Sequence, residues 1–91
     1  MMVEITGADM RRNEDGSFVG KTIFSLDNHK AKYEITFFSK RGSEWDYSLS
    51  FAEEPGSEEQ FLQTDALLEN NDDVYNQLLD AAIDAQEGQE E

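Results

Sequence analysis

The chain has 91 residues, no cysteine, 37% hydrophobic residues and a formal net charge of −14. This length is sufficient for one small domain, and six Phe, three Tyr and one Trp supply large side chains for its core. The absence of cysteine excludes disulfides, thiolate metal sites and thiol nucleophiles.

The charge is distributed unevenly along the chain. Residues 53–91 contain thirteen of the 21 acidic residues and no Lys, Arg or His, whereas all seven bases lie in residues 1–52. An asymmetry of this kind indicates a polarised molecule. Direct binding to nucleic acid or to an anionic membrane is disfavoured, because both require positive charge.

Targeting signals are not evident in the sequence. Residues 1–5 do not show a basic segment followed by a long apolar run, so we expect no signal peptide. No stretch approaches the ~20 apolar residues that a membrane span requires. We therefore expect a cytoplasmic protein, in a cell or in an infected host cell.

The first half of the chain predicts four antiparallel strands. The expected ranges are about 3–6, 17–26, 31–39 and 44–52, separated by turn-forming residues at 13–16, 27–30 and 40–43. The last range is the clearest, because Trp45, Tyr47, Leu49 and Phe51 alternate strictly with small or polar residues. This periodicity is typical of a β-meander with one dry face.

Two features of these strands leave alternatives open. Gly20, on the apolar side of the second strand, marks either a bulge or a close contact. Val19, Ile23 and Phe38 point away from the dry face. Either N-terminal or loop segments cover them, or they form a homodimer or partner surface on the outer side of the sheet.

The second half predicts helices. Ser57 is a candidate N-cap with Gln60 as its capping-box partner, which starts a helix through 57–70. Alternatively, 57–63 is extended and Thr64 caps a shorter helix. A second helix is expected over about 73–86, capped by Asn71 or Asp72, with an apolar stripe at Val74, Tyr75, Leu78, Leu79, Ala82 and Ile83.

These elements predict an α+β fold, in which a four-stranded antiparallel β-meander carries one or two C-terminal helices packed on one face. Residues 1–87 are expected to form a single domain. Gly88 is expected to end the second helix, and residues 88–91 to form a frayed acidic tail.

Catalytic and metal chemistry find little support in the sequence. The single histidine, His29, lies in a predicted turn, where we expect a solvated side chain. No nucleophile motif or phosphate-binding glycine loop occurs. Residues 13–16 and 70–73 resemble calcium loops only superficially, because the Asp and Glu spacing of such loops is missing. We predict no enzyme, no metal site and no cofactor.

The acidic second half is the candidate functional surface. Asp73, Asp80, Asp84 and Glu87 share one face of the second predicted helix, where like charges four residues apart repel each other. A basic partner would relieve this repulsion and would bind faster in the acidic field. The candidate partner-binding residues are Asp73, Asp80, Asp84 and Glu87, supported by Asp72, Glu58, Glu59, Asp65 and Glu69.

The sequence therefore predicts an acidic inhibitor or adaptor that docks on a basic, nucleic-acid-binding protein, as nucleic-acid mimics, immunity proteins and anti-defence proteins do. The alternative is a small structural or housekeeping module, homodimeric through the outer sheet face, whose acidity serves only solubility. Adaptation to high salt is a third explanation of the acidity.

Overall fold

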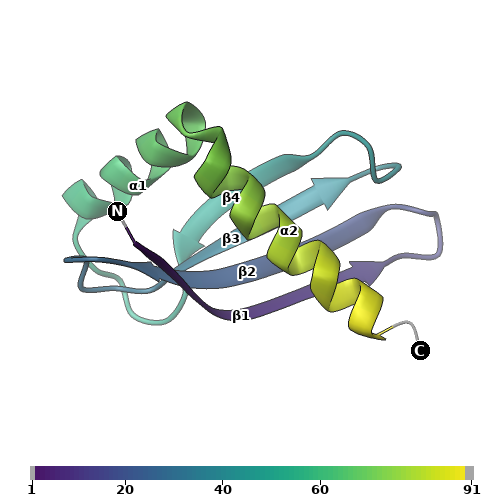
Figure 1. The fold of residues 1–91 in the computed structure, drawn as a ribbon, viewed down its shortest axis with the longest axis horizontal. Helices are drawn as coiled ribbons and strands as arrows, with labels where there is room; N and C mark the ends of the chain where they lie inside the picture. Colours follow the sequence, from purple (N-terminus) through teal and green to yellow (C-terminus); the bar gives the residue numbers. More distant parts are fainter. Residues whose placement is uncertain (1, 90–91) are drawn as a thin grey trace.

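The computed structural model describes the backbone of residues 2–89 and the side chains of residues 2–85. The elements are β1 (Val3–Arg12), β2 (Phe18–Leu26), β3 (Tyr33–Ser39), β4 (Asp46–Phe51), α1 (Glu58–Asn70) and α2 (Asp72–Gln89). The strands form one antiparallel sheet in the order β1-β2-β3-β4. Both helices pack on one face of it (Figure 1), which confirms the predicted α+β meander, with two helices.

Strand β1 is longer than the predicted 3–6, and that prediction is wrong. The strand continues to Arg12, with a bulge between Ile5 and Gly7. Ile5 pairs with Phe24 before the bulge, and Met10 pairs with Gly20 after it. The extra residue moves the inward-facing positions from odd to even numbers, so the sequence shows no continuous period of two.

The close approach of β1 to β2 requires glycine at position 20. A Cβ on Gly20 would lie 2.6 Å from the backbone oxygen of Asp9 and 2.7 Å from the sulfur of Met10. The Met10 side chain fills this space and is almost fully buried. Gly20 therefore marks a close contact, while the bulge lies on the neighbouring strand.

The core lies between the inner face of the sheet and the two helices. The sheet contributes six buried apolar side chains, Met10, Phe24, Leu26, Tyr33, Ile35 and Phe37. Helix α2 crosses them diagonally over β1 and β2 (Figure 1) and inserts Leu78 and Ala82, both fully buried. The buried Thr22 hydroxyl donates a 2.8 Å hydrogen bond to the Leu78 carbonyl, which fixes where α2 sits on the sheet.

Helix α1 is one continuous helix, so the alternative of an extended 57–63 is wrong. The Ser57 hydroxyl accepts from the Gln60 N–H at 3.2 Å, as an N-cap does. The Gln60 side chain does not close the predicted capping box. Instead, it accepts from the Lys30 N–H and donates to the Asn28 carbonyl, both at 3.1 Å. Helix α1 is thereby tied to the β2–β3 turn.

Helix α2 starts as predicted and ends later. The Asn71 side-chain oxygen accepts from the N–H groups of Asp73 and Val74. The helix continues through Gly88 to Gln89, because one glycine in a last turn costs only about 1 kcal/mol. Residues 90–91 of the predicted tail lie outside the described residues. Neither α1 nor the described α2 is long and apolar enough to cross a membrane.

Candidate functional site

Three carboxylates lie along the solvent side of α2. Asp73, Asp80 and Asp84 are exposed and point away from the buried Leu78 and Ala82. Helical geometry places all three within an arc of about 40° and spaces them over about 16 Å of the helix axis. We call these three residues the acidic row. The side chain of Glu87, the fourth predicted member, lies outside the described residues.

The acids at the start of each helix have a structural role as well. Glu58 and Glu59 occupy the first turn of α1, and Asp72 occupies the first turn of α2. All three are exposed, and negative charge in a first turn is favourable because of the helix dipole. Helix α1 begins at the end remote from α2 (Figure 1), so Glu58 and Glu59 are separate from the acidic row.

Asp65 and Glu69 belong to a different surface, beside strand β4. Burial raises the pKa of the Tyr47 phenol above 10.0, and the negative charges of Asp65 and Glu69 raise it further. The ring of Tyr47 meets that of Tyr75 with centroids 5.5 Å apart. The predicted acidic residues therefore do not form one continuous face, and the sequence patterns did not identify this tyrosine pair.

The tyrosine pair predicts a measurable alkaline titration. Burial raises the pKa of Tyr75 above 10.0, and the charge of Asp46 adds to this effect. Both phenols are kept neutral by the fold, so their contribution to stability is present below about pH 10 and is lost as the pH rises through the folded pKa values. In a pH titration, the phenolate absorbance should rise in steps at a higher pH than free tyrosine shows. Tyr47→Phe and Tyr75→Phe should each remove one of these steps. If both phenols ionised at the pKa of free tyrosine, the burial described here for Tyr47 and Tyr75 would be wrong.

His29 is packed between elements, which contradicts the predicted solvated side chain. Its Nδ1 lies 2.8 Å from the Tyr33 hydroxyl and 3.5 Å from the Thr64 hydroxyl. Helix α1 covers the turn that carries His29, a placement that local sequence does not encode. Among the described residues, no group of three or more His, Cys, Asp or Glu side chains is placed to hold a metal ion.

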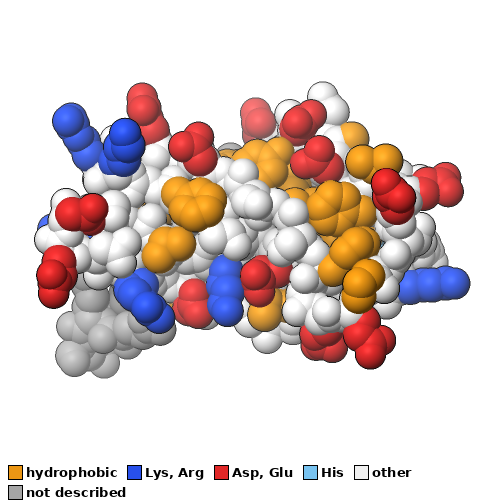
Figure 2. Space-filling model, turned by 180° about the vertical axis from the view of Figure 1, so that it is seen from behind, with side chains coloured by type: hydrophobic (Ala, Val, Ile, Leu, Met, Phe, Trp, Pro, Cys, Tyr) orange, Lys and Arg blue, Asp and Glu red, His pale blue; other side chains and the backbone are white. Residues whose placement is uncertain are grey.

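The outer face of the sheet is open. Phe38 is 44% exposed, and Val19 and Ile23 are half-buried. Both helices lie on the other side of the sheet, and β1 pairs at its edge, so no described segment covers these residues. Figure 2 shows hydrophobic side chains among charges of both signs on this face.

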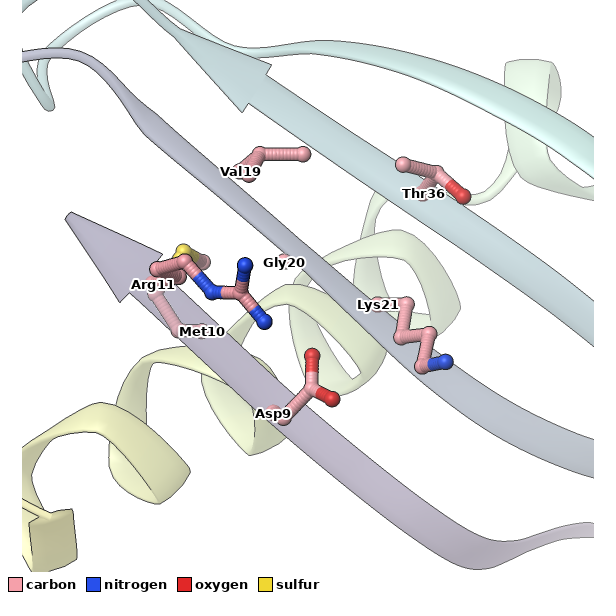
Figure 3. A pocket seen from close by; sticks show the side chains of 7 residues that line it. All are labelled: Asp9, Met10, Arg11, Val19, Gly20, Lys21 and Thr36. Atoms are coloured by element: carbon pink, nitrogen blue, oxygen red, sulfur yellow. The ribbon is translucent and has the colours of Figure 1, made fainter. Parts of the chain in front are cut away.

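A shallow depression of about 330 Å³ lies on the outer face, between β1, β2 and β3. Asp9, Arg11 and Lys21 project around it from the two neighbouring strands (Figure 3). The side chains of Val19 and Thr36 complete its rim. One acidic and two basic side chains lie here, unlike on the helices, whose charged residues are all acidic.

No protein-family model matches the chain, and no curated protein or solved structure was found to be similar to it.

Proposed function

We propose that this protein is a non-catalytic inhibitor or adaptor that docks its acidic row on a basic, nucleic-acid-binding protein. One observation carries the proposal: Asp73, Asp80 and Asp84 are exposed along a single line of α2, and neither helix contains a base. The carboxylates would take the positions of phosphates in a basic cleft. The protein would thus act by occupying the cleft, as nucleic-acid mimics, immunity proteins and anti-defence proteins do.

The rigid support of α2 favours this role. Leu78 and Ala82 are fully buried on the side opposite the acidic row, and Thr22 holds the Leu78 carbonyl from the sheet. The row therefore has one orientation before any partner arrives. A preorganised surface loses less conformational entropy on binding, which improves affinity.

The electrostatics of α2 also favour a basic partner. Asp80 and Asp84 are one turn apart, and such like-charge pairs destabilise a helix by a few tenths of a kcal/mol. A Lys or Arg surface would remove that repulsion and would accelerate the encounter. Asp72, Glu58 and Glu59, in the first turns of the two helices, extend the acidic field beyond the row.

The surface beside β4 offers additional contacts. Asp65 and Glu69 lie near enough to Tyr47 to raise its pKa, and the Tyr47 ring contacts that of Tyr75, so carboxylates and aromatic rings lie together there. Tyrosine is enriched among the residues that dominate binding energy at interfaces. A partner that reaches around α2 toward β4 would contact this group.

The test reverses the charge of the row. In Asp80→Lys/Asp84→Lys, both substituted positions are exposed, so the fold should persist while affinity for the partner falls by about 100-fold. The wild-type chain is immobilised and exposed to an extract of its native host. The basic proteins that it retains are then eluted in a salt gradient and identified. Calorimetry with the purified partner then compares the variants.

A matched control separates geometry from net charge. Glu53→Lys/Glu54→Lys changes the net charge by the same amount, at exposed positions in the loop before α1. We expect it to bind within a few-fold of the wild type. Equal losses in both variants would show that only net charge matters. If Asp80→Lys/Asp84→Lys bound as the wild type does, docking through the acidic row would be wrong. The acidity would then serve only the solubility of a structural or housekeeping module.

A further inference from the structure

The sheet register places four outward side chains in one row across all four strands. Arg11 pairs with Val19, Val19 pairs with Phe38, and Phe38 pairs with Asp46. A base therefore stands at one end of this cross-strand row, an acid at the other, and two apolar side chains between them. Arg11 and Asp46 are exposed, and Phe38 is 44% exposed, the largest exposed fraction among the apolar strand residues.

Such a row is complementary to itself. Rotation by 180° about an axis parallel to the strands, lying between Val19 and Phe38, brings a second copy face to face with the row reversed. Arg11 then opposes Asp46 of the second copy, and Val19 opposes Phe38 of the second copy. Each two-fold interface contains every such contact twice. We propose that two copies of this chain pair in this way through their outer sheet faces.

The neighbouring row is compatible with the same arrangement. Asp9, Lys21, Thr36 and Ser48 are cross-strand neighbours, again one residue from each strand. Under the same rotation, Asp9 opposes Ser48 and Lys21 opposes Thr36, so no like charges meet. Packed sheets lie about 10 Å apart and their strands cross at about −30°. Because of this angle, residues of the two copies face each other most directly near the rotation axis, where Val19 and Phe38 lie.

The charge distribution favours this face over every helical surface. Helices α1 and α2 carry nine acids and no base. The outward strand positions and their immediate flanks carry both signs, with acids at Glu4, Asp9, Asp27, Glu34 and Asp46 and bases at Arg11, Lys21, Lys32 and Lys40. Two chains with a net charge of −14 therefore meet with least repulsion sheet to sheet. The acidic rows of the pair then face outward on opposite sides.

The decisive experiment is a charge swap followed by sedimentation velocity of the full chain. The wild type should sediment as a dimer. Arg11→Asp alone, or Asp46→Arg alone, places like charges at both symmetry-related contacts and should weaken the dimer by about 100-fold. Arg11→Asp/Asp46→Arg restores opposite charges and should return the dimer to within a few-fold of the wild type.

Two apolar substitutions complete the design. Phe38→Ser should give a folded monomer, since the residue is on the surface of a paired strand. Leu62→Ser is the control and should leave the dimer intact, because Leu62 is 59% exposed but lies on α1, away from the outer sheet face. A wild-type monomer at about 1 mM would overturn the proposal. A dimer that Phe38→Ser leaves intact, or a charge swap that restores nothing, would overturn it equally. Partner binding through the acidic row is scored separately, with Asp80→Lys/Asp84→Lys.

Discussion

Replacing Leu78 with alanine should lower the free energy of unfolding by about 2–5 kcal/mol. Leu78 is fully buried where α2 crosses the sheet, and its backbone carbonyl accepts from Thr22. Truncation removes the apolar contact and leaves a cavity. The sheet can fill this cavity only in part, because its backbone hydrogen bonds hold the strands in place. Small domains have only about 5–15 kcal/mol of stability, so this loss is a large fraction of the total.

Urea unfolding followed by Trp45 fluorescence measures the effect. Leu62→Ala is the matched control, since the same chemical change at a 59% exposed position should stay within about 0.5 kcal/mol. If Leu78→Ala is too unstable to fold, Leu78→Met keeps most of the volume and should cost less than about 1.5 kcal/mol. Equal stability of Leu78→Ala and Leu62→Ala would show that α2 is not packed on the sheet.

Tyr33→Ala should cost about 3–5 kcal/mol, the range for truncating a buried aromatic ring. The Tyr33 ring is fully buried and has aromatic neighbours from three other elements. Ring centroids lie 5.6 Å away for Phe24 on β2, 5.8 Å for Phe51 on β4 and 6.3 Å for Phe61 on α1. One side chain therefore joins the centre of the sheet to its β4 edge and to α1.

Tyr33→Phe separates the ring from its hydroxyl. The hydroxyl lies 2.8 Å from His29 Nδ1, and losing this one hydrogen bond should cost about 1 kcal/mol. Thermal unfolding of both variants, followed by circular dichroism, gives the comparison. If Tyr33→Phe were as costly as Tyr33→Ala, the polar link to His29, rather than aromatic packing, would be the main contribution of Tyr33.

Much of the fold could be predicted because its signals are local. Strict alternation from Trp45 to Phe51 indicates β4, and the Ser57 cap and the apolar stripe around Leu78 indicate the two helices. The charge asymmetry that defines the acidic second half is also a property of the sequence itself. Each of these signals depends on residues within a few positions of one another, or on composition alone.

Longer-range features could not be predicted in the same way. The bulge after Ile5 breaks the strand period, so β1 could be recognised only through its pairing with β2. His29 reads as a solvated turn residue until α1 folds over it. The candidate acids looked like one face, but the helix packing places Asp65 and Glu69 beside Tyr47, apart from the acidic row.

By itself, the sequence determined that four strands precede a helical half without a single base, and it narrowed each helix cap to two candidates. The tertiary structure alone decided which side chains become neighbours: Gly20 under Met10, Tyr33 between three aromatic rings, and Arg11 in line with Asp46 across four strands. The physical reason is that periodicity and capping are set within one or two turns of chain. Strand register and helix placement instead minimise the exposed apolar surface of the whole molecule, through contacts between residues far apart in sequence.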